Sequence, residues 1–124
     1  MSYSVLLIEN DPSYCDLISE TLYREFPKAT KIECYPTYEQ AFGVLFYKKW
    51  NLILIDRDLP TKNGLDTLKA IQGVANSEGT RIFLYARNNN KSFEEEAVSL
   101  GAIATLSRDD LASSKGAQQL LSYL

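Results

Sequence analysis

The sequence contains no histidine at all, and it has only two cysteines among its 124 residues. The absence of histidine excludes Ser-His and Cys-His catalytic pairs and every proton shuttle based on an imidazole. It also leaves too few nitrogen and sulfur ligands for a zinc site. Any chemistry of this chain therefore has to be sought among its other side chains.

A basic excess and a long apolar run are missing as well. The formal net charge is −3, so direct nucleic-acid binding through a basic face is not expected. No apolar run approaches membrane-spanning length, and residues 1–4 do not resemble the start of a signal peptide. We therefore expect a cytoplasmic protein without membrane contact, in which Cys15 and Cys34 are reduced and packed.

What the chain does have is enough apolar residues, 45% of the total, to form one domain with its own core over residues 1–124. Continuous runs of four apolar residues at 5–8 and 52–55 are typical of strands buried on both faces of a parallel sheet. The alternation of polar and apolar residues at 31–35 favours a strand near a sheet edge. With further strands expected at 81–86 and 103–106, the strand–helix order occurs five times and predicts an α/β fold with a doubly wound parallel sheet.

Capping residues mark where the expected helices begin and end. Asp11 before Pro12, and Thr37 with Gln40 three residues later, are typical helix starts. The remaining boundaries are a turn at Pro60 and Gly64 before the third helix, a break at Asn76-Ser77-Glu78-Gly79, a capping box at Ser92-Phe93-Glu94-Glu95, a left-handed end at Gly101, and a last helix opened by Asp109 or Asp110 and weakened by Gly116.

Acidic side chains follow two of the apolar strands. Glu9-Asn10-Asp11 comes after the first strand, and Asp56 comes after the third. If these strands are neighbours, the acids meet at one sheet edge, where two carboxylates about 4 Å apart repel by on the order of 4 kcal/mol at a dielectric of roughly 20. A cation, or a Lys or Arg side chain, has to compensate them. Oxygen ligands favour Mg²⁺, and a carboxylate beside Mg²⁺ is suited to accept a phosphoryl group. The alternative, that these acids only cap helices, stays open.

Around these acids, the sequence resembles the receiver domain of bacterial response regulators. The resemblance covers nearly the whole chain and rests on residues 6–12, on Ile55-Asp56 with Leu59-Pro60 and Gly64, and on Gly101-Ala102. It implies a flavodoxin-like sheet of five parallel strands in the order 2-1-3-4-5. It also implies that a histidine kinase or phosphotransfer protein transfers a phosphoryl group onto Asp56. The Mg²⁺ ligands that it implies are Glu9, the residue at position 10, Asp56 and the backbone carbonyl of Asp58.

The sequence departs from the family at its accessory positions. Asn10 stands where a second acid is usual, Tyr85 replaces Thr or Ser on strand four, Thr105 replaces an aromatic residue on strand five, and Arg108 replaces Lys. We interpret the chain as an atypical receiver with weak Mg²⁺ binding and with weakened or no control by phosphorylation. It would then signal through contacts with a kinase or phosphotransfer protein, a downstream signalling protein, or both. A fully functional aspartyl-phosphate switch with Mg²⁺ stays open, as does a homodimer through the last helix and strand.

Two of the altered residues carry specific predictions. Arg108 is expected to pair with Asp56, because a guanidinium can hold a carboxylate in bidentate fashion. The alternative places Arg108 in solvent against Asp109 or Asp110. Tyr85 is expected to pack its ring and to place its hydroxyl at the surface of the fourth helix, fifth strand and fifth helix, which would fix that face in one state. The alternative points Tyr85 to solvent.

Two other functions share parts of this pattern. Asp56-Arg57-Asp58 is similar to the Asp-x-Asp motif of haloacid-dehalogenase-type phosphatases, but the chain has no cap domain that excludes water. A flavodoxin-like FMN binder shares the strand order, but here Pro12-Ser13-Tyr14 starts a helix where a phosphate-binding loop is needed. A non-enzymatic signalling module is therefore the preferred interpretation.

Overall fold

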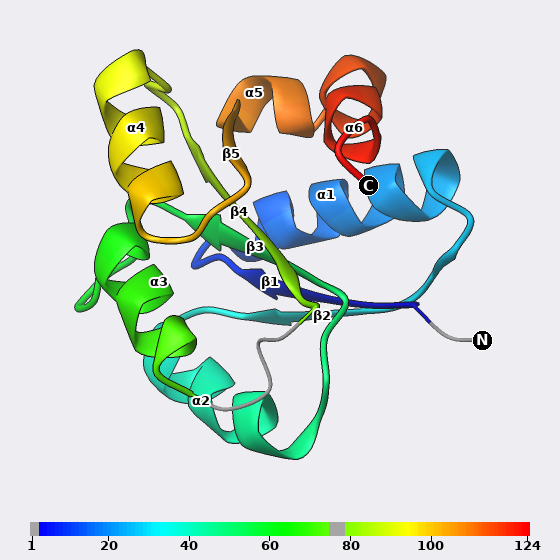
Figure 1. Cartoon of the computed structure of the whole chain (residues 1–124). Coiled ribbons are helices and arrows are strands. Elements are labelled where there is room, and N and C mark those ends of the chain that lie inside the picture. Colours follow the sequence, from blue (N-terminus) through cyan, green and yellow to red (C-terminus); the bar gives the residue numbers. More distant parts are fainter. Residues whose placement is uncertain (1–2, 75–78) are drawn as a thin grey trace.

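The computed structural model describes residues 3–74 and 79–124, which form a parallel sheet with helices on both faces (Figure 1). The sheet has five strands in the order β2-β1-β3-β4-β5, as predicted, and its pairings are parallel. The strands are β1 (Tyr3–Ile8), β2 (Ala29–Tyr35), β3 (Leu52–Asp56), β4 (Arg81–Ala86) and β5 (Ala104–Ser107). The helices are α1 (Pro12–Glu25), α2 (Tyr38–Tyr47), α3 (Gly64–Gln72), α4 (Lys91–Ser99), α5 (Arg108–Leu111) and α6 (Ser114–Leu121).

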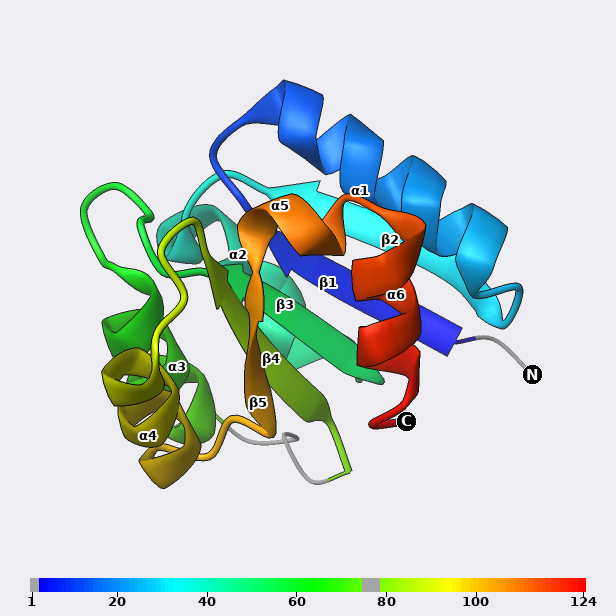
Figure 2. The same ribbon diagram turned by 90° about the horizontal axis from the view of Figure 1, so that it is seen from above.

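The helices lie in two layers, with α1, α5 and α6 on one face of the sheet and α2, α3 and α4 on the other (Figures 1 and 2). Side chains alternate between these faces along each strand. Val5 and Leu7 belong to the core under α1, whereas Leu6 and Ile8 belong to the core over α2 and α3. All four are fully buried, which explains why the strand is apolar without interruption.

Two of the predicted helix starts are confirmed, and a third is wrong. The side chains of Asp11 and Thr37 each accept a hydrogen bond from a backbone N–H in the first turn of α1 and α2. Asn90 makes the same kind of bond in α4, so that this helix begins at Lys91 and the capping box expected at Ser92 is not formed. Asn90, whose side-chain oxygen accepts from the backbone N–H of Phe93, had not been considered as a cap from the sequence.

Two glycines occupy positions where a residue with a side chain would be strained or would clash with the backbone. Gly101 ends α4 with a φ of +108°, the left-handed conformation predicted for it. Gly64 opens α3 where an added Cβ would lie 2.5 Å from the backbone oxygen of Asp56, so the loop after β3 folds closely against the strand end. The break expected at Asn76-Ser77-Glu78-Gly79 lies for the most part outside the described residues.

The last helix is interrupted. Ser107 caps α5 and Ser113 caps α6, so the expectation of one helix opened by Asp109 or Asp110 is wrong. Gly116 lies next to the interruption, where an added Cβ would be 1.9 Å from the backbone oxygen of Asp110. This glycine therefore allows α6 to pack closely on α5. From the sequence it was expected only to lower the stability of a continuous helix, and this role was not predicted.

The two cysteines are joined in a disulfide, so the expectation of reduced side chains is wrong. Cys34 lies on β2 opposite Leu7 of β1, and Cys15 lies near the start of α1. Their Cα atoms are 6.4 Å apart, which is within the usual range for a disulfide. The packing of α1 against β2 creates this proximity, and the separation of 19 residues in the sequence does not reveal it.

Reduction of the Cys15–Cys34 bond is expected to lower the free energy of unfolding by about 3 kcal/mol. A cross-link over 19 residues restricts the unfolded chain, and its loss returns that conformational freedom. Urea denaturation with and without dithiothreitol measures the difference, and the variant Cys15→Ala/Cys34→Ala serves as the control that no longer responds to the reductant. Identical urea midpoints for the wild type in both conditions would show that the bond does not form in solution.

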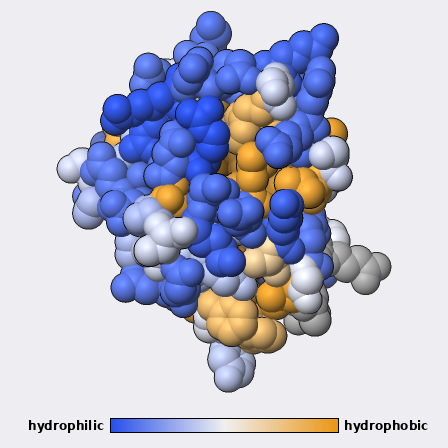
Figure 3. Space-filling model, turned by 90° about the vertical axis from the view of Figure 1, so that its left-hand side faces the viewer, coloured by the Kyte–Doolittle hydropathy of each residue, from blue (hydrophilic) through white to orange (hydrophobic). Residues whose placement is uncertain are grey.

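Exposed aromatic side chains are concentrated on α2. Phe42 and Phe46 are about half exposed and pack edge to face, and Tyr47 is 91% exposed. Figure 3 shows apolar side chains among polar ones on the face of the molecule that carries α2, α3 and α4. None of the helices within the described residues is both long and apolar enough to cross a membrane.

Candidate functional site

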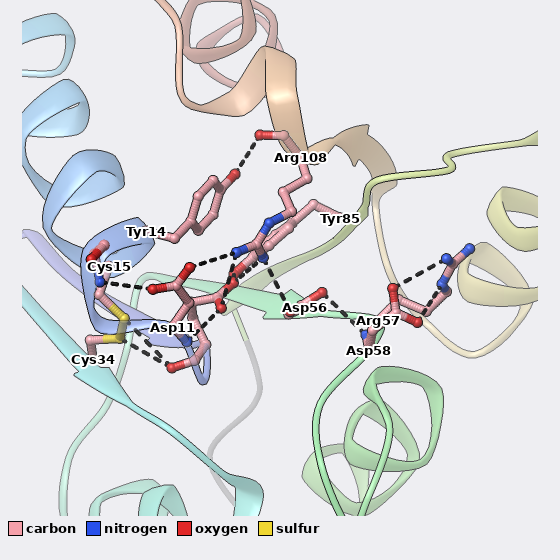
Figure 4. Close-up of polar contacts among 11 residues, drawn as sticks. Asp11, Tyr14, Cys15, Cys34, Asp56, Arg57, Asp58, Tyr85 and Arg108 are labelled. Carbon is pink, nitrogen blue, oxygen red and sulfur yellow. Dashed lines mark hydrogen bonds and ion pairs between the residues drawn. A yellow bond between two sulfur atoms is a disulfide. The ribbon is translucent and has the colours of Figure 1, made fainter.

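Three polar side chains meet at the carboxyl ends of three neighbouring strands (Figure 4). Glu9 directly follows β1, Asp56 ends β3, and Tyr85 lies opposite Asp56 on β4. In the two-residue alternation, each falls on the same side as the strand residues that pack under α1, such as Leu7 and Leu54. All three are buried, with at most 6% of their surface exposed. The predicted meeting of the acids at one sheet edge is thus confirmed.

Arg108 at the start of α5 places its guanidinium between the two acids. Its Nη1 donates to Glu9 Oε1 and, at 3.2 Å, to Asp56 Oδ2, while its Nη2 donates to Glu9 Oε2 at 3.3 Å. The side chain is 9% exposed, so it is not in solvent against Asp109 or Asp110. The predicted pairing with Asp56 is confirmed, and the contact with Glu9 in addition was not predicted.

Both carboxylate oxygens of Glu9 are fully engaged. Oε1 accepts from the Tyr85 hydroxyl at 2.7 Å in addition to Arg108, and Oε2 accepts from the backbone N–H of Asp11 at 2.9 Å in addition to Arg108. Hydrogen bonds to a buried charge are among the stronger ones in proteins. Glu9 is therefore the residue that holds the cluster together, although sequence reasoning had given that place to Asp56.

Tyr14 completes the cluster and was missed as a site residue, because its spacing on α1 indicated only a core position. Its ring centroid lies 3.7 Å from Arg108 Cζ, which is a cation–π contact, and its hydroxyl donates to the Arg108 backbone carbonyl. Burial raises the pKa of both Tyr14 and Tyr85, and the charge of Glu9 raises them further. Both hydroxyls therefore stay neutral and act as donors at physiological pH.

The predicted position of the Tyr85 hydroxyl is wrong. Tyr85 is fully buried on the α1 side of the sheet, and its hydroxyl binds Glu9 instead of reaching the surface of α4, β5 and α5 or the solvent. Thr105 lies on the other side, where its hydroxyl is 2.8 Å from Asn89 Oδ1 and 3.1 Å from Glu94 Oε2 of α4. The alternation along β4 and β5 decides this, because Tyr85 has the parity of Phe83 and Thr105 has the opposite parity to Leu106.

Burial is the main influence on the charge of Asp56, and it raises the pKa of this carboxyl to about 6. The charges of Glu9 and Asp58 raise the pKa as well. The backbone N–H of Asp58, which donates to Asp56 Oδ1 at 3.1 Å, and the charge of Arg108 act in the opposite direction. Asp56 is therefore ionised above pH 6 but protonates at mildly acidic pH.

The four residues expected to hold Mg²⁺ line one open pocket of about 290 Å³: Glu9, Asn10, Asp56 and Asp58. They do not fit the ion in this arrangement, because Arg108 engages both oxygens of Glu9 and one oxygen of Asp56. Asn10 is exposed and brings no charge, and no group of three or more Asp, Glu or Cys side chains among residues 3–74 and 79–124 is arranged to hold a metal. The positive charge that the acids require comes from Arg108.

The family model described as "Response regulator receiver domain" matches residues 5–112. The chain belongs to the response regulator receiver family. As a receiver, it is a signalling module of two-component systems rather than a catalytic enzyme. The alternative of an Asp-x-Asp phosphatase is thereby set aside. In agreement with this, Asp58 is exposed, and its two carboxylate oxygens accept hydrogen bonds from Arg57 Nε at 3.0 Å and from Arg57 Nη2 at 3.2 Å.

Solved receiver structures share the fold of this chain. The chemotaxis protein CheY4 of Vibrio cholerae is 17% identical with a TM-score of 0.86, and the match covers 99% of this chain and 98% of that one. The receiver domain of the histidine kinase CKI1 from Arabidopsis thaliana, in complex with Mg²⁺ and BeF₃⁻, is 17% identical with a TM-score of 0.76 over 97% and 90%. The Mn²⁺-bound form of response regulator Rcp1 is 19% identical with a TM-score of 0.75 over 96% and 94%. A search of curated proteins found no match.

Proposed function

We propose that this chain is a receiver domain in which Arg108 takes over the charge compensation that a divalent cation provides in other receivers. Control by phosphorylation is then weak or absent, and the domain signals through protein–protein contacts. The observation that carries this proposal is the guanidinium of Arg108, which binds both oxygens of Glu9 and one oxygen of Asp56 in a buried cluster.

Within this proposal, Asp56 occupies the phosphoacceptor position of the family. Glu9, Asn10, Asp56 and the backbone carbonyl of Asp58 occupy the metal positions, where Mg²⁺ binds weakly because it has to displace Arg108 first. Tyr85, Thr105 and Arg108 occupy the accessory positions that take part in the response to phosphorylation in other receivers. Tyr85 supports the closed cluster through Glu9, and Thr105 ties β5 to α4, so neither side chain is free to move towards Asp56.

A second candidate function is a working aspartyl-phosphate switch with Mg²⁺. It is supported by the open pocket in front of Asp56, which Arg87 and Arg108 line with positive charge suited to a phosphoryl group. The two candidates differ in one measurable property, namely whether Asp56 reacts while Arg108 keeps its contacts with Glu9.

Acetyl phosphate or beryllofluoride with Mg²⁺ is expected to leave wild-type Asp56 essentially unmodified in mass spectrometry, and to leave the amide NMR signals of β5 unshifted. The variant Asn10→Asp/Arg108→Lys is expected to form the adduct, because it regains a carboxylate ligand and loses the bidentate fork. Asp56→Asn in the same background is the matched control and must stay unmodified. A stable wild-type adduct with shifts that spread to β5 would support the working switch.

The remaining parts of the proposal concern the setting of the domain. Residues 1–124 act as one receiver domain, whose partners are a histidine kinase or phosphotransfer protein, a downstream signalling protein, or both. Receiver domains interact with histidine kinases, which supports the first of these. The proposed location of the domain is the cytoplasm. A homodimer through β5 and the last helical segment, α6, is part of the same proposal.

A further inference from the structure

The disulfide and the acid cluster meet at a single residue, Glu9. The sulfur atoms of Cys15 and Cys34 lie 3.5 and 3.8 Å from the Glu9 carbonyl oxygen (Figure 4). The backbone N–H of Glu9 donates to the carbonyl of Tyr35, the residue after Cys34, at 2.9 Å. The carboxylate of the same Glu9 binds Arg108. A change at the disulfide therefore acts on the backbone of the residue that holds the cluster.

The disulfide is also within reach of small reagents. Both cysteines line an open hollow of about 210 Å³, together with Asn10, Pro12 and Asp16. A water molecule takes up roughly 30 Å³ in the liquid, so a hollow of this size admits a hydroperoxide or a small thiol. Cys15 itself is 8% exposed, whereas Cys34 on the edge strand β2 is only partly buried. Cys34 is thus the sulfur that an incoming reagent meets first.

We propose that Cys15 and Cys34 form a reversible redox site, oxidised by a hydroperoxide and reduced by a dithiol, which sets how firmly Glu9 holds Arg108 over Asp56. The effect on Asp56 rests on the function proposed above. The formation of the bond and its effect on Arg108 do not.

The oxidation of the two thiols to the disulfide takes place in two steps. The Cys34 thiolate attacks one peroxide oxygen, so that an S–O bond forms, the O–O bond breaks and an alcohol or water leaves. The Cys15 thiolate then attacks the Cys34 sulfur, the S–S bond forms, and the S–O oxygen leaves as water after taking a proton. Two electrons pass from the sulfurs to the peroxide. In the reverse direction, a dithiol reduces the bond through a mixed disulfide and becomes a disulfide itself.

The coupling to Arg108 follows from what the bond fixes. When the disulfide is closed, it links the start of α1 covalently to the end of β2, next to the loop that begins at Glu9. When it is open, this covalent restraint is lost and the loop is held only by its non-covalent contacts, so the contact between Glu9 and Arg108 breaks more often. We expect the population of the open contact to rise about tenfold, which is within the usual range of coupling between two sites.

The experiment uses the full chain in two arms. In the first, the protein is equilibrated with mixtures of oxidised and reduced dithiothreitol, and free thiols are alkylated and counted by mass spectrometry. Both thiols are expected to appear together in one transition, and hydrogen peroxide is expected to restore the bond. In the second, NMR follows the guanidinium protons of Arg108, whose exchange with water is expected to be about tenfold faster in the reduced protein, in line with the coupling above.

The control is Cys15→Ala/Cys34→Ala, which is expected to match the reduced wild type and to respond to neither reagent. The proposal would be overturned if hydrogen peroxide did not join the two thiols. It would also be overturned if the guanidinium protons of Arg108 exchanged with water at the same rate in both redox states. The reactivity of Asp56 towards beryllofluoride and Mg²⁺ is measured in parallel. If Arg108 exchange changes while Asp56 reacts fully in both states, the redox site stands and the proposed function fails.

Discussion

Replacement of Arg108 by methionine is expected to lower the free energy of unfolding at pH 7.5 by about 3 to 5 kcal/mol. The substitution keeps a long apolar stem but leaves the buried carboxylates of Glu9 and Asp56 without their cation, and the loss of one partner of a buried ion pair has this magnitude. Urea denaturation measures the change. The matched control is Arg24→Met, which removes an arginine whose side chain is 57% exposed and should shift stability by no more than about 0.5 kcal/mol.

The same variant distinguishes an arginine that replaces a cation from one that merely fills space. Without Arg108, each oxygen of Glu9 loses one of its two partners and Asp56 Oδ2 becomes free beside the open pocket. Mg²⁺ should therefore raise the midpoint of unfolding of Arg108→Met in a concentration-dependent way. Wild type should show little or no response at the same concentrations. A variant that is destabilised no more than Arg24→Met, or an equal Mg²⁺ response in wild type, would contradict the role assigned to Arg108.

The second large effect concerns pH and Asp56. The pKa of this carboxyl is raised by burial from 3.8 to about 6 in the folded protein. Between these values the folded chain binds more protons than the unfolded chain, so the contribution of Asp56 to stability is fully present below pH 4 and is lost as the pH rises through 6. A shift of about two units corresponds to about 3 kcal/mol.

Asp56→Asn removes this contribution, because an amide does not titrate in that range. Urea denaturation at a series of pH values from 3 to 7.5 should show that wild type loses about 3 kcal/mol more than Asp56→Asn as the pH rises. Asp16→Asn removes an exposed carboxylate and serves as the control, with a pH profile parallel to that of wild type. Parallel profiles for wild type and Asp56→Asn would show that Asp56 is not desolvated in solution.

Local sequence patterns were sufficient to identify most strands and helices of this protein, whereas the order of the strands in the sheet was implied only by the family resemblance. The uninterrupted apolar runs at 5–8 and 52–55 identified strands buried on both faces, and they lie side by side in the centre of the sheet. Asp11 and Thr37 marked helix starts that are formed as expected. These features are predictable because strand periodicity and helix capping depend on residues within about four positions of one another.

The side of the sheet on which Tyr85 lies was also readable from the sequence, although the prediction missed it. Side chains alternate with a period of two, so Tyr85 shares its side with Phe83, and Thr105 takes the side opposite to Leu106. The prediction instead assigned Tyr85 a role by analogy with an aromatic residue on another strand. Parity alone would have placed the Tyr85 side chain on the side of Phe83, away from α4.

Tertiary structure alone decided that Arg108 reaches Glu9 in addition to the predicted Asp56, and that the two sulfurs meet. Arg108 had Asp109 and Asp110 beside it in the sequence, yet it binds Glu9 and Asp56, which are 99 and 52 residues away. Burial decides that choice, because two carboxylates enclosed at one sheet edge need a cation far more than exposed ones do. Cys15 and Cys34 likewise meet only because α1 packs against β2. No local pattern records such contacts, since they exist only once distant strands have been brought to a common edge.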